Sequence, residues 1–224
     1  SIRAEWLCGS DWRGTPPHQR GLTSLTLLLA DLKTLDLWQV SERTSPILPV
    51  LPFHLTTLKL RYIKDPSSSR LVDALSRQSS ITSLHVTSAN FDQTVFLERV
   101  RTLAPQLVRL KYRCECSSAL TVDFVKRCTQ LKHLTVHLHQ FEDFALSTTP
   151  LVSCTVSDVF CSGLPTILDA LNSESVTIAK LEQLRLKFMP LDMQDLDSDP
   201  RWPELKTRCR EMEIELIVLD RGEG

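Results

Sequence analysis

A six-residue pattern of apolar and polar positions recurs along the chain. Residues 131–136 read Leu-Lys-His-Leu-Thr-Val, with apolar residues first, fourth and sixth and polar residues third and fifth. Alternation of this kind is typical of a strand with one buried face. The pattern occurs, with some replacements, at residues 32–37, 55–60, 81–86, 107–112, 131–136, 151–156, 181–186 and 209–214. It therefore predicts a series of eight half-buried strands.

The segments between these strands predict helices in most of the connections. Apolar residues spaced three and four apart favour a helix. This spacing occurs in residues 71–75, 95–103, 120–128 and 164–171. A further helix is expected over residues 200–210. The shortest connection, which precedes residue 151, predicts only an irregular turn.

Strands and helices alternating at this interval predict a leucine-rich-repeat solenoid. Successive copies of the pattern lie 20 to 30 residues apart, close to the usual repeat of about 20–29 residues. Each coil can bury its leucines only against its neighbours. We expect an α/β fold of about eight repeats, with a concave parallel β-sheet and helices or irregular turns on the convex side. Residues 1–30 are expected to form an N-terminal cap, 31–220 the repeat domain and 221–224 a C-terminal tail.

The ninth position of the pattern predicts that the solenoid is irregular. In the usual repeat this position holds Asn or Cys, whose side chain can bond to the backbone of the turn after the strand. Here it reads Val40, Ile63, Ala89, Glu115, His139, Val159, Met189 and Ile217. The turns must therefore be fixed in other ways.

The third, fifth and seventh positions predict the composition of the exposed sheet face. In-register strands place equivalent positions about 4.8 Å apart. Opposite charges are then expected to pair across neighbouring strands, at Asp36–Lys59, Arg185–Glu213 and Lys187–Glu215. Other cations have no acidic neighbour in these rows, which predicts a basic centre. It comprises Arg109, Lys111 and Arg113 with His85, His133 and His137.

The basic centre predicts a binding site for an acidic or phosphorylated protein segment, since arginine matches carboxylate and phosphate geometry. Trp38 beside Arg61 adds an expected cation–π contact to the same face. One alternative is an ordinary solvated face. Another is nucleic acid, which Tyr112 disfavours because it occupies a core position and cannot stack on bases. The candidate partner-binding residues are Arg109, Lys111, Arg113, His85, His133, His137, Arg61 and Trp38.

No pattern in the sequence indicates catalysis, a cofactor or a metal. The nucleophile-elbow, phosphate-loop, dinucleotide and zinc-protease motifs are absent. His133, His137 and His139 share a strand face and could bind a metal with Glu115 or Cys116, but a solvated face explains them more simply. The acidic stretch 192–199 lacks EF-hand spacing. We interpret it as a solvated loop in which Ser198 or Asp199 caps the following helix.

Net charge and cysteine placement favour an intracellular protein. The net charge of −1 predicts no general attraction to nucleic acid or membranes, and no apolar run reaches the roughly 18 residues that cross a bilayer. Of seven cysteines, Cys154 and Cys209 occupy apolar positions of the pattern and are interpreted as reduced core residues. We expect the cytoplasm or nucleus.

The irregular spacing, the intervening helices and the closing segment 205–214 resemble fungal F-box/leucine-rich-repeat proteins. In that family an N-terminal F-box docks a Skp–cullin ubiquitin ligase and the repeats hold a substrate. Residues 1–30 are too few for an F-box, which would have to lie outside this chain. We therefore expect a non-catalytic protein-interaction scaffold or adaptor, as a substrate-recognition or assembly subunit. The alternatives are a ligase substrate receptor and a leucine-rich-repeat subunit that associates with RNA or other nucleic acid.

Overall fold

The computed structural model is an α/β structure in which every described strand pair is parallel. It describes residues 33–38, 55–61, 78–88, 93–114, 119–145, 150–173, 176–189 and 196–219. The chain divides into two compact units, Ser1–Leu107 and Val108–Gly224. The expected cap 1–30, the tail 221–224 and the helix expected at 71–75 lie outside the described residues.

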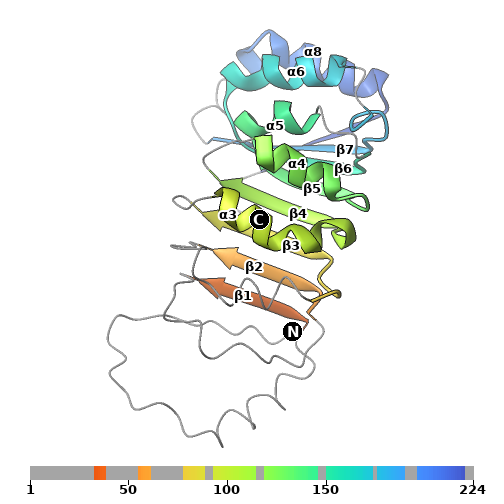
Figure 1. The fold of residues 1–224 in the computed structure, drawn as a ribbon. Coiled ribbons are helices and arrows are strands. Elements are labelled where there is room, and N and C mark those ends of the chain that lie inside the picture. Colours follow the sequence, from red (N-terminus) through yellow and green to blue (C-terminus); the bar gives the residue numbers. More distant parts are fainter. Residues whose placement is uncertain are drawn as a thin grey trace, which may run out of the picture. The chain divides into compact units, whose positions relative to one another are not determined.

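The described part of the first unit is a three-stranded parallel sheet followed by helical turns (Figure 1). Its elements are β1 (Thr34–Trp38), β2 (Thr57–Arg61), β3 (Ser83–Ser88), α3 (Gln93–Val100) and the 3-10 helix η2 (Arg101–Gln106). The strands pair in register, so that Leu35, Leu58 and Leu84 form one buried row. The register predicted from the fourth position of the pattern is confirmed in this unit.

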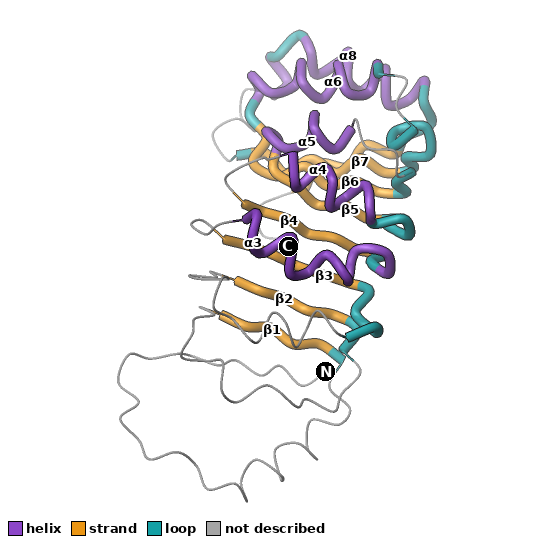
Figure 2. The backbone as a smooth tube through the Cα atoms, in the orientation of Figure 1, coloured by secondary structure: helices purple, strands orange, loops and turns teal. Residues whose placement is uncertain are grey.

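The described part of the second unit contains five parallel strands and four helices. Its strands are β4 (Arg109–Cys114), β5 (His133–His137), β6 (Ser153–Val159), β7 (Gln183–Phe188) and β8 (Glu215–Leu219). Its helices are α4 (Ala119–Arg127), α5 (Leu138–Ala145), α6 (Leu164–Asn172) and α8 (Arg201–Glu211), with the 3-10 turns η3 (Cys161–Gly163) and η4 (Leu196–Ser198). The helices lie along one side of the strands, and each packs on the next (Figure 2). Since parallel strands need a crossover between them, each helix returns the chain to the start of the next strand.

A row of apolar residues runs through the core of the second unit. Leu110, Leu134, Cys154 and Leu184 pair in register on consecutive strands and are at most 2% exposed. The expected burial of Leu110, Leu134 and Cys154 is therefore confirmed. Cys209 is also buried.

Backbone hydrogen bonds fix the start of each strand to the strand before it. The N–H groups of Lys132 and His133 both donate to the carbonyl of Val108, at 2.9 and 3.1 Å. Val152 and Ser153 donate in the same way to the carbonyl of Lys132, at 2.9 and 3.0 Å. The arrangement anchors the register at the amino ends of the strands.

The last strand lies further along the chain than the sequence pattern predicts. Gln183 of β7 pairs with Glu215, not with Glu211. The expected strand at 209–214 is wrong because α8 continues through Glu211 and buries Cys209 within the helix. The backbone reverses at Glu213, which adopts a left-handed conformation (φ 58°), before β8 begins.

The shortest connection contains a helix where an irregular turn was expected. α5 begins at Leu138, directly after the last residue of β5. The side-chain oxygen of Gln140 accepts the N–H of His137 at 3.3 Å, and Phe141 is buried at 2% exposure. Starting the helix without a loop lets a short connection still cover the core.

No helix in the described part of the chain combines the length and the apolar character needed to span a bilayer.

Candidate functional site

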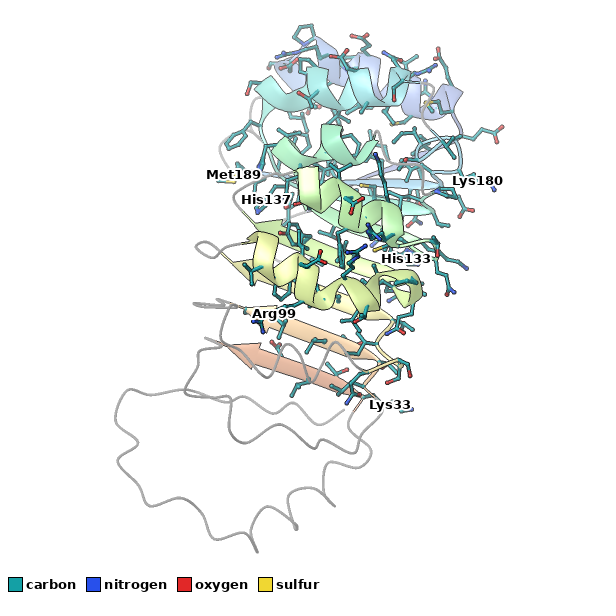
Figure 3. All side chains as sticks on the ribbon, viewed as in Figure 1. Lys33, Arg99, His133, His137, Lys180 and Met189 are labelled. Carbon is teal, nitrogen blue, oxygen red and sulfur yellow. The ribbon has the colours of Figure 1, made fainter. Side chains whose placement is uncertain are left out.

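The face of β4–β8 that is opposite the described helices carries the polar side chains of the strands, and we call it the open face. In β5 the alternate residues His133, Thr135 and His137 are half-buried, whereas Leu134 and Val136 are buried against the helices. Figure 3 labels His133 and His137, which lie toward opposite ends of this strand. The strand pattern thus divides the open face into two clusters.

The first cluster, here called the basic patch, lies around His133. It consists of Arg109 and Lys111 of β4, His133 of β5 and Arg185 of β7. Arg109 pairs directly with His133 in the register of β4 and β5. Burial lowers the pKa of His133, and the positive charges of Arg109, Arg185 and the neighbouring Lys132 lower it further. The cations of β4 and β7 therefore act together on one imidazole.

Carboxylates do not neutralise the principal cations of the basic patch. Among the described residues, no Asp or Glu forms an ion pair with Arg109 or Arg185. Arg185 instead donates to the side-chain oxygen of Gln183 at 2.9 Å, and the amide of Gln183 donates to Glu215 at 2.7 Å.

The corrected register of β8 explains why Arg185 joins the patch and why Lys187 has no acidic residue opposite it on β8. Both were expected to face acidic residues of the last strand. They pair instead with Ile217 and Leu219. The expected pairs Arg185–Glu213 and Lys187–Glu215 are therefore wrong. Arg185 belongs to the basic patch, whereas Lys187 pairs with Ser157 in the row of His137.

The second cluster is an ion network of Arg113, His137 and Asp158. Nη2 of Arg113 lies 3.1 Å from Oδ2 of Asp158, and Nδ1 of His137 lies 2.5 Å from the same oxygen. The expectation that Arg113 has no acidic neighbour is wrong, because the carboxylate comes from β6, two strands away. Arg113 and His137 are thus neutralised locally, unlike Arg109.

A bulge in β6 places Asp158 on the open face. The pairing of β6 with β7 shifts between Ser157 and Val159, and Asp158 has a left-handed backbone (φ 56°). Asp tolerates this conformation better than most residues other than Gly. Two consecutive polar residues, Ser157 and Asp158, interrupt the alternation of the strand, and they are the sequence signal that could have revealed the bulge.

The ion network favours a charged Asp158 and a neutral His137. Burial tends to raise the pKa of Asp158, but the charges and hydrogen bonds of Arg113 and His137 outweigh it, and the net shift is downward. Burial lowers the pKa of His137, and Arg113 and His139 lower it further, while Asp158 opposes them. A neutral His137 can then donate its Nδ1–H to Asp158.

A cleft of about 530 Å³ adjoins the ion network at the carboxyl ends of β5 and β6. His137 and His139 stack at its wall with ring centroids 5.4 Å apart, and Phe160 is 45% exposed there. Among the described residues, no hydroxyl or thiol is hydrogen-bonded to His137.

Three candidate residues lie in the first unit. Arg61 forms an ion pair with Asp36 at 3.0 Å, in place of the expected Asp36–Lys59 pair. Nε2 of His85 lies 3.0 Å from the hydroxyl of Thr87 on its own strand. The backbone of Trp38 belongs to β1, but its side chain lies outside the described residues, so the expected cation–π contact with Arg61 remains a prediction.

The alternatives for metal binding involve residues that the structure describes only in part. Within the described ranges, no three His, Cys, Asp or Glu side chains are grouped as metal ligands. Glu115, Cys116 and residues 192–195 lie outside those ranges. The expected N-cap at Ser198 or Asp199 is wrong, because the N-cap of α8 is Pro200. The carboxylate of Asp199 nevertheless accepts the N–H of Arg201 at 2.9 Å and forms an ion pair with its guanidinium.

No family model and no curated protein sequence matches this chain. The candidate site is therefore defined by its own geometry.

Proposed function

We propose that this chain is a non-catalytic protein-interaction module of the leucine-rich-repeat type, whose open sheet face binds an acidic or phosphorylated segment of another protein. The seven copies of the sequence pattern from residue 32 to residue 186, and the parallel in-register pairing of strands within each unit, support a solenoid with this face on its concave side. The role suits a substrate-recognition or assembly subunit. The thiols of Cys128, Cys154 and Cys209, buried and free, are consistent with a reducing compartment such as the cytoplasm or nucleus.

The observation that carries the proposal is the convergence of cations on His133. Arg109 and Arg185 come from different strands, yet both lower the pKa of the same imidazole. In a chain whose net charge is −1, this cluster is a local feature rather than a result of composition. An anionic partner would relieve the repulsion between these groups.

The spacing of the patch suits an extended segment. β4 and β7 are three strand spacings apart, so the strand positions of Arg109 and Arg185 are separated by about 15 Å. An extended chain covers this span with roughly five residues at about 3.3 Å each. The partner segment would place acidic or phosphorylated residues near both ends of such a stretch, with the polar side chains of β5 and β6 between them.

Charge reversal tests the proposal. Acetylated and amidated hexaglutamate serves as the probe, and its affinity is measured by calorimetry for the native chain, Arg109→Glu and Arg185→Glu. Each reversal should weaken binding about tenfold, which corresponds to a loss of about 1.4 kcal/mol of binding free energy. Lys126→Glu is the matched control, because Lys126 is exposed in α4 on the opposite side of the sheet.

The outcomes separate the proposed partner from the alternatives. Equal losses in Arg109→Glu and Lys126→Glu would show that only overall charge matters. A single-stranded oligodeoxythymidine that binds more tightly than hexaglutamate, with the same sensitivity to Arg109→Glu, would favour the nucleic-acid alternative instead.

A further inference from the structure

Strand β8 is exposed on the side where the other strands of its unit are buried. Leu184 and Leu186 of β7 face the helices and are fully buried. In β8 the equivalent residues are Leu216, which is half-buried, and Val218, which is 36% exposed. Among the described residues, no further strand follows β8 to cover these two side chains.

A groove between α8 and β8 adjoins these residues. It has a volume of about 320 Å³, which lies in the range of pockets that hold small ligands or side chains. Trp202, Ile214, Leu216 and Val218 form its apolar lining, and Lys206 and Arg210 of α8 contribute positive charge. Lys206 lies over the ring of Trp202, 5.3 Å from its centroid.

The backbone of β8 offers hydrogen bonds on its outer edge. β7 pairs with one edge, and no strand in the described part of the chain pairs with the other. Proteins usually protect such edges with proline, charged residues or bulges. Residues 216–219, which read Leu-Ile-Val-Leu, contain none of these.

We propose that the edge of β8 and the adjoining groove form a second binding surface, which takes up an extended segment of another protein as an additional strand. Backbone pairing supplies affinity, and pockets for alternate side chains supply specificity in this mode of recognition. Every second residue of the bound segment faces α8, and these residues are, in order, acidic, aliphatic, aliphatic and acidic. The aliphatic residues fill the groove, and the acidic ones lie near Lys206 and Arg210. This surface is separate from the basic patch and does not depend on the function proposed for it.

Charge favours a different protein over a second copy of this chain as the occupant. A two-fold pairing of β8 with itself would use the same surface of both copies. It would bring the two α8 helices to the same side of a continuous sheet, with Lys206 and Arg210 of each copy facing the same cations of the other. An acidic segment would instead be attracted to Lys206 and Arg210 of the groove.

The test uses the acetylated and amidated peptide Glu-Thr-Val-Thr-Val-Thr-Glu, in which alternate residues have the required pattern. Calorimetry should show saturable binding to the native chain. A peptide with lysine at both ends should bind at least tenfold more weakly. A peptide with N-methyl groups on the amides that face β8 should also lose at least tenfold, because it cannot pair with the strand.

Variants of the chain locate the binding. Val218→Asp should weaken binding at least tenfold, whereas Val176→Asp, at an exposed valine that does not line the groove, should leave it unchanged. The double variant Lys206→Glu/Arg210→Glu should reverse the preference and favour the lysine peptide. Arg109→Glu should have no effect. Thermal unfolding confirms that each variant is folded.

Three results would overturn the proposal. The native chain fails to bind the acidic peptide, or it binds the N-methylated peptide equally well. Alternatively, sedimentation shows a dimer that Val218→Asp dissociates, in which case a second copy occupies the edge.

Discussion

His133 reports the electrostatic character of the open face. It accepts or donates a hydrogen bond with the hydroxyl of Ser153, whose oxygen lies 2.8 Å from Nδ1. Burial and the charges of Arg109, Arg185 and Lys132 lower its pKa, so the ring is neutral at pH 7. The ring gains a proton only when the pH falls below its lowered pKa, or when a bound anion offsets the positive charges around it.

Asp158 has a left-handed backbone, and its carboxylate interacts with both Arg113 and His137. Asp158→Gly and Asp158→Ala both remove the ion pairs with Arg113 and His137. Only Ala retains a Cβ that is strained at a φ of 56°, at a cost of about 1–2 kcal/mol. We predict that the free energy of unfolding in urea is lower for Asp158→Ala than for Asp158→Gly. If Ala proves as stable as Gly, the left-handed conformation at this bulge is wrong.

Buried residues on neighbouring strands should differ in how much unfolding free energy is lost when each is replaced by alanine. Leu134 of β5 is 2% exposed between rows of β4 and β6, and its replacement by Ala should cost about 2–5 kcal/mol of unfolding free energy. Cys154 on the next strand has a smaller side chain, so Cys154→Ala should cost less. Chemical denaturation of both variants checks this expectation. Equal losses would argue against the register that makes these residues neighbours.

Most strands could be predicted because leucine marks both their position and their register. A shift of one residue would turn Leu110 or Leu134 to the open face, so the apolar pattern permits only one alignment. The last strand was misplaced because Cys209 and Met212 imitate the pattern within a helix. Cys209 is buried within α8 and Met212 is the residue that caps its C-terminus, an outcome that depends on tertiary packing, which the local sequence does not reveal.

The candidate site could be predicted only in part, for the same physical reason. Arg109 and His133 lie side by side, as their positions in the pattern indicate. Arg113 differs because one inserted residue in β6 brings Asp158 across two strands. The apparent neutralisation of Arg185 followed from the misplaced β8. A row-by-row reading succeeds where strands are regular and fails at a bulge or a shifted strand.

For the whole molecule, we propose that a protein with a net charge of −1 concentrates positive charge at the surface where an acidic partner would bind. Such binding is coupled to protonation of His133. An acidic segment on the basic patch raises the pKa of His133, so the complex binds more protons than the free chain. Affinity should then increase as the pH falls from 7 toward 5, a range in which glutamate side chains, with a pKa of about 4.3, stay mostly ionised.

The decisive experiment is to measure the pKa of His133 by NMR in the free chain and in the chain saturated with hexaglutamate. The free chain should give a pKa below the ordinary histidine value of about 6.5, and hexaglutamate should raise it. If the pKa of His133 is unchanged in the saturated complex, the peptide is bound elsewhere, and the basic patch is not its binding site.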